Sequence, residues 1–241
     1  MSFYSKISHP QYDAVAFLKT VSLFTNLQKD DLADIAKRVT RHPYPSGVTL
    51  FHQDTPGTLL YMLEEGRVRV FGVGITGQEH TLNTFGPGEI FGELSILDGK
   101  PRSASAMTMT PSVIWMLSKT DFDYFLEKCF AFSKTLMILL AERIRTTASH
   151  VEAIIFQDVQ GRLAYELLHL SEKHGNRTPE GILIEIPLTQ NDLAAMVGAT
   201  RESVNKAFVY LRGQNLVQVD GTQITVLDSE GLSAVMFQRG R

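Results

Sequence analysis

The spacing of apolar residues divides the N-terminal two thirds of the 241-residue chain into three stretches. From residue 15 to about residue 39, apolar residues recur near helical spacing, which predicts helix. Between about residues 43 and 116, short strand-like segments such as residues 59–63 and 67–71 are separated by glycine. That pattern is typical of the strands of a β-roll or barrel. Residues 121–157 contain neither glycine nor proline and are again helical in pattern.

The last of these stretches carries a narrow apolar stripe. Ile144, Thr147, Val151 and Ile154 follow one another at steps of 3, 4 and 3 residues, with Leu140 one turn earlier. The stripe is narrower than the face that a helix usually buries in its own domain, and it matches the seam of paired helices. We therefore expect these five residues at a homodimer interface. Packing within one chain is the alternative for the first half of the stretch, which is apolar on all sides.

A new texture begins at Asp158, which can cap a further amphipathic helix. The chain is therefore expected to be an α+β protein. Its predicted parts are a β-roll (jelly-roll-like) sensor domain at residues 1–130, a dimerisation helix at 131–157 and a helical output domain at 158–241. Residues 173–181 are polar and predict a loop.

The output domain has the pattern of a winged helix. Thr189 can cap a helix that Gly198 ends, and Thr200 can cap a second helix. Residues 216–219 and 223–227 then alternate in polarity on either side of an Asp-Gly turn, which predicts a hairpin. A helix-turn-helix followed by a hairpin is a winged helix.

Composition excludes several classes of protein. The chain is 44% hydrophobic and 20% charged, as ordinary globular domains are. Its single cysteine, Cys129, allows neither a disulfide within one chain nor an all-cysteine iron–sulfur cluster. No apolar run approaches the roughly 20 residues of a membrane span, and residues 1–6 lack the apolar core of a signal peptide. We therefore expect a cytoplasmic protein with no membrane partner.

Two further patterns are interpreted as structural. Residues 72–77 read GVGITG, which fits a dinucleotide-binding motif. A strand rather than a helix is expected to follow them, so a glycine-rich hairpin turn is predicted. His42, His52 and His80 lie in the β-rich region without the close spacing of metal ligands. We predict neither a metal nor a catalytic residue, and a cupin-like metal enzyme is the alternative.

The strongest chemical signal lies in residues 91–105, which read FGELSILDGKPRSAS. Glycine lets backbone approach a ligand closely, arginine can neutralise a phosphate, and a carboxylate can accept a hydrogen bond from a sugar hydroxyl. The order Gly-Glu-Leu…Arg-Ser-Ala resembles the phosphate-binding cassette of cyclic-nucleotide-binding domains in the CRP/FNR (catabolite activator) family of transcription regulators.

This resemblance implies a role for each residue. Glu93 would hold the ribose 2′-hydroxyl, Arg102 and Ser103 the cyclic phosphate, and Arg143 could pair with Glu93. The residues expected to bind nucleotide are Gly92, Glu93, Leu94, Ser95, Arg102, Ser103, Ala104, Arg143, Thr147 and Ala148.

The long helix carries the residues that face the base. In the cAMP-responsive members, a threonine from one subunit and a serine from the other contact adenine. Thr147 and Ala148 stand at these positions here. One neutral hydrogen bond is worth about 0.5–1.5 kcal/mol, so the missing hydroxyl costs roughly 2- to 12-fold in affinity. We expect cAMP as the effector; a regulator with another effector or none is the alternative.

The second helix of the helix-turn-helix resembles the family's recognition helix. Arginine can bind guanine O6 and N7, and glutamate can accept from cytosine N4. Lys206 replaces the family's second arginine, and Gln190 replaces a phosphate-contacting arginine. The residues expected to bind DNA are Thr189, Gln190, Thr200, Arg201, Glu202, Ser203, Asn205 and Lys206.

Charge and partners complete the expectation. Residues 158–241 hold 8 Lys and Arg against 10 Asp and Glu, which predicts weak nonspecific DNA binding and a shallow salt dependence. The expected partners are a palindromic double-stranded DNA site, a second copy of the chain and RNA polymerase. Ligand would place the two recognition helices about 34 Å apart, one turn of DNA.

Overall fold

The computed structural model describes residues 13–74, 77–186 and 188–237. Residues 1–6, which lack the apolar core of a signal peptide, therefore lie outside the described part. The first helical stretch is divided into α1 (Ala14–Leu18), the short 3-10 helix η1 (Ser22–Phe24) and α2 (Lys29–Ala36). Its apolar residues are buried on more than one side, as Leu18, Val21, Leu23 and Phe24 are all fully buried. A single amphipathic helix cannot bury so many consecutive faces, and the segment therefore folds as separate turns.

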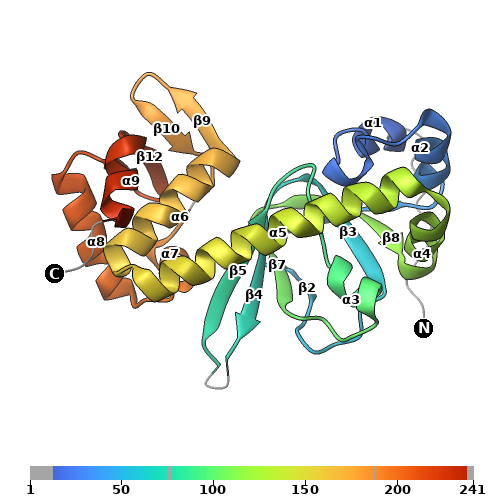
Figure 1. Ribbon diagram of the computed structural model, residues 1–241, viewed down its shortest axis with the longest axis horizontal. Coiled ribbons are helices and arrows are strands. Elements are labelled where there is room, and N and C mark those ends of the chain that lie inside the picture. The colour runs from blue at the N-terminus through green and yellow to red at the C-terminus, as the bar shows by residue number, and fades with distance from the viewer. Residues whose placement is uncertain (1–12, 75–76, 187, 238–241) are drawn as a thin grey trace.

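The β-rich region forms a sandwich beside the long helix (Figure 1). One four-stranded sheet has the order β1-β8-β3-β6 and the other the order β2-β7-β4-β5. All of their pairs are antiparallel. The strands are β1 (Thr40–Tyr44), β2 (Thr49–Phe51), β3 (Leu59–Glu65), β4 (Val68–Val73), β5 (Glu79–Phe85), β6 (Ile90–Phe91), β7 (Ser105–Thr108) and β8 (Ser112–Ser118). Aromatic side chains fill the space between the sheets; for instance, Tyr61 and Phe91 stack at 5.2 Å between ring centroids.

The GVGITG motif connects two strands and opens no helix. The N–H of Gly74 donates to the carbonyl of Gln78 at 2.8 Å, and β4 pairs with β5 on the strand side of this turn. The interpretation as a hairpin is confirmed.

Two separate helices follow the sandwich, although the helical sequence pattern of residues 121–157 is continuous. The helix α4 (Lys119–Lys128) ends at Cys129, whose φ of −115° and ψ of 98° are not helical. The helix α5 (Phe130–Phe156) then runs for 27 residues along the sandwich. Its first turns pack on the sensor core through Phe132 and Leu136. Further along, Ile144, Val151 and Ile154 are 70%, 49% and 48% exposed in the single chain.

The C-terminal part begins after a break at Gln157 and Asp158, where the Asp158 side chain caps α6 (Val159–His174). The expectation of a loop at residues 173–181 is wrong: strands β9 (Gly175–Thr178) and β10 (Gly181–Ile184) occupy most of it. They extend the predicted hairpin of β11 (Val217–Asp220) and β12 (Gln223–Val226) to a four-stranded sheet, β11-β12-β10-β9. The helix-turn-helix consists of α7 (Gln190–Val197) and α8 (Arg201–Gly213), and α9 (Ser229–Phe237) packs on α6.

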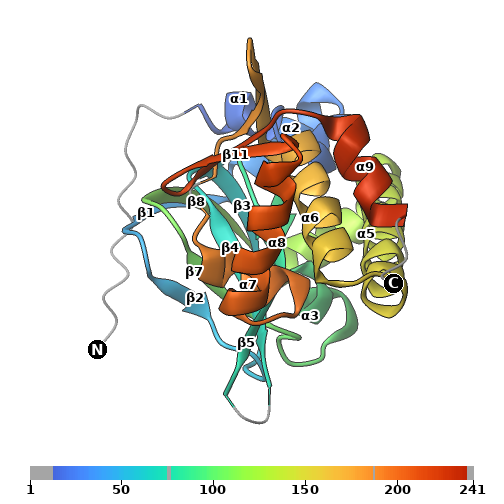
Figure 2. The ribbon, with the colours of Figure 1, turned by 90° about the vertical axis from the view of Figure 1, so that its left-hand side faces the viewer.

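The C-terminal part packs on the sandwich of the same chain. Helix α7 contacts β5, the strand at the edge of its sheet, and Figure 2 shows α7 directly above β5. Met109, in the turn between β7 and β8, packs against the C-terminal core. Within the described residues, no helix is long and apolar enough to span a membrane.

Candidate functional site

The FGELS segment forms a tight turn between a strand and a short helix. Strand β6 ends at Phe91, Gly92 has a φ of 80°, and α3 (Glu93–Asp98) begins at the next residue. A Cβ on Gly92 would lie 2.7 Å from Nη1 of Arg102, and one on Gly57 would lie 2.2 Å from Oγ of Ser95. Glycine is therefore required at both positions, because the arginine passes directly against the backbone.

Arg102 is held in a fixed position beneath this turn. Its Nη1 donates to the carbonyl of Gly92 at 2.5 Å and to Oγ of Ser95 at 2.8 Å, and its Nη2 donates to the carbonyl of Leu59 at 2.8 Å. The guanidinium also lies 4.2 Å from the ring centroid of Phe51. The side chain is 4% exposed, and burial lowers its pKa from the ordinary value. Its Nε, also buried, has no hydrogen-bond partner in the described structure.

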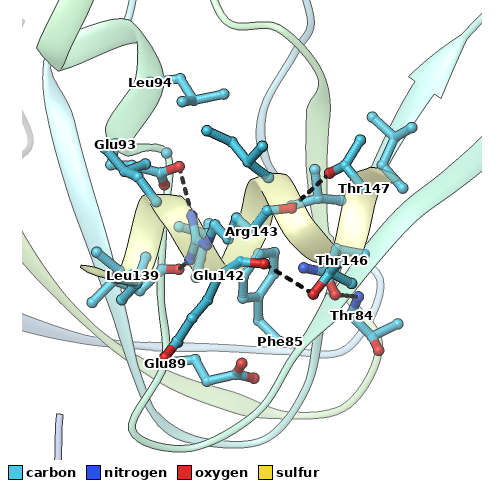
Figure 3. A pocket seen from close by; sticks show the side chains of 18 of the residues that line it. Thr84, Phe85, Glu89, Glu93, Leu94, Leu139, Glu142, Arg143, Thr146 and Thr147 are labelled. Carbon is cyan, nitrogen blue, oxygen red and sulfur yellow. Dashed lines mark hydrogen bonds and ion pairs between the residues drawn. The ribbon is translucent and has the colours of Figure 1, made fainter. Parts of the chain in front are cut away.

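Glu93 forms an ion pair with Arg143 of α5, as the sequence led us to expect. Their Oε1 and Nη1 atoms are 2.5 Å apart, and Arg143 also donates to the carbonyl of Ile90 (Figure 3). Glu93 is 3% exposed. The guanidinium of Arg143 lies 5.2 Å from the ring centroid of Phe85 on β5. The pair thus joins the start of α3 to the middle of the long helix.

These groups line one cavity of about 1170 Å³ between the sandwich, α5 and the C-terminal part. All ten residues predicted to bind nucleotide are on its wall. Sequence reasoning missed the residues that β5, the end of α5, α6 and α7 add to it, among them Asn83, Thr84, Phe85, His150, Glu166, His169, Lys173 and Met196. No local motif marks them, because packing between distant elements brings them to the cavity, and those of α6 and α7 reach it only through the docking of the C-terminal part.

The α5 face of the cavity carries Thr147 and Ala148. Both are exposed, and Oγ1 of Thr147 donates to the carbonyl of Arg143 at 2.9 Å. A threonine hydroxyl in this position still has lone pairs for a ligand. Ala148 offers none.

No group of three or more His, Cys, Asp or Glu side chains among the described residues could hold a metal ion. His42, His52 and His80 belong to no such group. Cys129 is buried, and burial raises the pKa of its thiol.

The helix-turn-helix is held by the capping residues predicted from sequence. The Thr189 hydroxyl accepts from the N–H of Asp192, whose carboxylate in turn accepts from the N–H of Thr189. The Thr200 hydroxyl accepts from the N–H of Ser203. These two threonines therefore have structural roles at the starts of α7 and α8, independent of any contact with DNA.

The first turns of α8 project their polar side chains to solvent. Arg201, Glu202, Asn205 and Lys206 are exposed. Lys206 pairs with Glu202 at 2.8 Å, and Nε2 of Gln190 donates to Oδ1 of Asn205 at 3.2 Å. The arrangement is a rigid helix with a polar end, which fits the major groove of DNA in size and chemistry.

The predicted dimer seam is divided. Leu140 is half-buried against the sensor core of its own chain, whereas Ile144, Thr147, Val151 and Ile154 are exposed. Met137, Ile155 and Phe156, with exposures of 59%, 65% and 72%, extend the apolar surface along α5.

Comparisons with known proteins agree with this geometry. Residues 41–129 match the cyclic nucleotide-binding domain and residues 161–235 the Crp-like helix-turn-helix domain. The chain is 32% identical over 216 residues to the CRP-like cAMP-activated global transcriptional regulator of Mycobacterium tuberculosis, which covers 90% of this chain and 96% of that protein. It is 31% identical to the cyclic AMP receptor protein of Thermus thermophilus, over 91% of this chain and 99% of that one.

Solved structures show the same architecture. The catabolite activator protein of Thermus thermophilus is 30% identical and superposes with a TM-score of 0.52 over 90% of this chain and 98% of that chain. The chain belongs to the CRP/FNR family of transcription regulators. It is a DNA-binding regulator with a cyclic nucleotide-binding domain, and not an enzyme.

Proposed function

We propose that this chain is a cAMP-responsive homodimer that binds a two-fold DNA site when the nucleotide occupies the cavity. The observation that carries the proposal is the placement of Arg102, Glu93 and Thr147 on the wall of one cavity. These residues supply a cation for the phosphate, a carboxylate for the ribose and a hydroxyl for the base. Both relatives named above are described as cAMP-activated or cAMP-receptor proteins.

The residues present fit a cyclic phosphate. Arg102 is buried with its Nε unpartnered, beside a turn whose glycine leaves no Cβ over the arginine. A buried guanidinium with spare donor capacity gains most from an anion, because charge-assisted hydrogen bonds are the strong ones. Ser103 is exposed on the cavity wall beside it and can add a hydroxyl donor.

The proposed homodimer follows from the exposed apolar residues of α5. Ile144 is 70% exposed in the single chain although it lies in the middle of a 27-residue helix. A second copy of α5 would cover this face and bring a second Thr147 and Ala148 to the seam. The cavity would then be completed by residues of both copies.

The proposed DNA contact uses Arg201 and Glu202 on guanine and cytosine, with Lys206 and Asn205 one turn further along α8. As the family resemblance implies, RNA polymerase is the third proposed partner. The location proposed for a chain with these partners is the cytoplasm.

The test is calorimetry of the purified chain with cAMP, cGMP and AMP. We expect cAMP to bind more tightly than cGMP, and AMP, which lacks the cyclic phosphate, to bind weakest. Equal affinity for cAMP and cGMP would overturn the base contact at Thr147. No binding of any of the three would overturn the proposed effector class.

A further inference from the structure

The end of α6 attaches the C-terminal part to the sandwich. Nζ of Lys173 donates to the carbonyl of Thr84 at 2.7 Å and to Oδ1 of Asn83 at 3.2 Å, and lies 3.0 Å from Oε1 of Glu89. The side chain of Lys173 therefore contacts both the end of β5 and the turn that leads from β5 to β6. Its ammonium group is 5.2 Å from the ring centroid of Phe85.

The ring of Phe85 joins this contact to the nucleotide cavity. Lys173 and Arg143 each lie 5.2 Å from its centroid, and Arg143 is the partner of Glu93. Figure 3 shows Phe85 beneath Arg143, with Thr84 and Glu89 close by. The Glu93–Arg143 pair and the Lys173 contact that holds the C-terminal part thus pack against the same aromatic ring.

The next residue, His174, is enclosed between the two parts of the molecule. It is 7% exposed, and its Nε2 is buried without a hydrogen-bond partner in the described structure. A Cβ added to Gly86 would lie 3.4 Å from Cε1 of His174 and 3.0 Å from Nη1 of Arg67, so the sensor side of this site is also cationic. A proton on Nε2 of His174 has no acceptor among the described residues and stands close to the positive charges of Lys173 and Arg67.

We propose that Lys173 and His174 form a proton-sensitive latch, which holds the DNA-binding part against β5 and is weakened when His174 takes up a proton. The released form is the one in which the two recognition helices are free to take the two-fold spacing of a DNA site. Only this statement about the recognition helices rests on the proposed function.

The sign of the pH dependence follows from the surroundings of His174. Burial, and then Lys173, Arg67 and His169, lower its pKa from 6.5 to about 3. The docked form therefore keeps its full stability above pH 6.5 and loses it as the pH falls below that value, because the released histidine binds the proton better. Between pH 7.5 and pH 5.5 the docking constant falls about tenfold through this residue alone, if release restores the pKa to 6.5.

Other titratable groups around the junction act in both directions. Burial lowers the pKa of His80 on β5 and of His169 on α6, which adds to the effect of His174. His150 on α5 pairs with the buried Glu166 at 2.9 Å, and this hydrogen bond raises its pKa. The pair therefore stabilises the docked form fully below pH 6.5. This contribution is lost as the pH rises through the raised pKa of His150. Glu89 faces Lys173, and the backbone N–H of Glu185 donates to the carbonyl of His174.

Native-state hydrogen exchange of the full chain, without nucleotide or DNA, tests the latch. Peptides spanning residues 79–89 and 190–197 report release, and peptides from β1 and β8 report global opening. Wild type is compared with His174→Phe, His174→Gln and Lys173→Met at pH 7.5 and pH 5.5. Comparison at one pH cancels the intrinsic rate of exchange. His42→Gln and Lys128→Met, at sites away from the junction, are the controls.

We expect the ratio of wild-type to His174→Phe opening to rise about tenfold from pH 7.5 to pH 5.5 in the two junction peptides alone. His174→Gln, which does not titrate either, should give the same change. Lys173→Met should open these peptides about tenfold or more at both pH values, because it loses hydrogen bonds to a charged group. An unchanged ratio in both histidine variants would overturn the proton sensitivity, and wild-type exchange in Lys173→Met would overturn the latch. Neither result depends on the effector or the DNA site.

Discussion

The cavity proposed to bind the nucleotide and the helix proposed to read DNA, α8, differ in how their side chains are held. In the cavity, Glu93 and Arg102 are 3% and 4% exposed and are bonded to other protein groups, those of Arg143, Gly92 and Ser95. On α8, the side chains of Glu202 and Lys206 are 79% and 74% exposed and bond mainly to each other. The side chains of the cavity are therefore preorganised. Those of α8 are positioned only by their helix and would become fixed when DNA binds. Substitutions should separate these two kinds of site.

The largest effect is expected at the exposed apolar face of α5, which the proposed homodimer needs. Ile144→Glu places a charge in the proposed dimer interface, and a monomer binds only one half-site. We expect the affinity for a two-fold DNA site to fall about 1000-fold, within the usual range for loss of bivalency. Sedimentation would give the mass and gel shift the affinity. Arg145→Glu, exposed on the same helix next to Ile144, is the matched control and should remain a dimer.

Within the cavity, Arg102→Ala should lower cAMP affinity about 100-fold, because it removes charge-assisted hydrogen bonds to the phosphate. Calorimetry measures this loss. Arg102→Lys keeps the charge but not the planar fork, and should recover only part of the affinity. Thermal unfolding is needed beside it, since Arg102 also bonds to Leu59 and Gly92. Full cAMP affinity in a folded Arg102→Ala chain would contradict the proposed binding of the phosphate by Arg102.

On the recognition helix, Arg201→Ala should cost roughly 5- to 150-fold in affinity per half-site, the value of one good base contact. Thermal stability and cAMP affinity should not change, because the side chain is exposed. Fluorescence anisotropy with specific and scrambled DNA gives the comparison. Arg212→Ala, in the last turn of the same helix, is the control. A drop of equal size on scrambled DNA would show a phosphate contact instead of base recognition.

The smallest effect concerns the base. Ala148→Ser restores the hydroxyl that the cAMP-responsive members carry, and should raise cAMP affinity roughly 2- to 12-fold. Ala148→Val, which adds bulk without a hydroxyl, should not. If both variants bind cAMP like wild type, position 148 does not face the base in this chain.

The contrast between the regions also explains what could be predicted from the sequence. The helix-turn-helix depends on local signals, the caps Thr189 and Thr200 and the glycine at 198, and all three are found where expected. The cassette is likewise local, whereas the pairing of Arg143 with Glu93 joins two distant elements and was expected only from the family resemblance. The strands β9 and β10 were missed, because polar residues 173–181 gain strand structure only by pairing β10 with β12. Lys173, His174 and Glu166 carried no signal at all, since their surroundings arise from docking between distant segments.

The central claim is that a nucleotide held by Arg102 controls DNA binding by α8. The most direct measurement is the affinity for a two-fold DNA site with and without cAMP, at one salt concentration and pH, for wild type and Arg102→Ala. The cAMP concentration is one that saturates wild type but lies well below the weakened Kd expected for Arg102→Ala. The account predicts that cAMP raises the affinity of wild type and leaves that of Arg102→Ala unchanged, while the two bind alike without nucleotide. An undiminished response to cAMP in Arg102→Ala would contradict it.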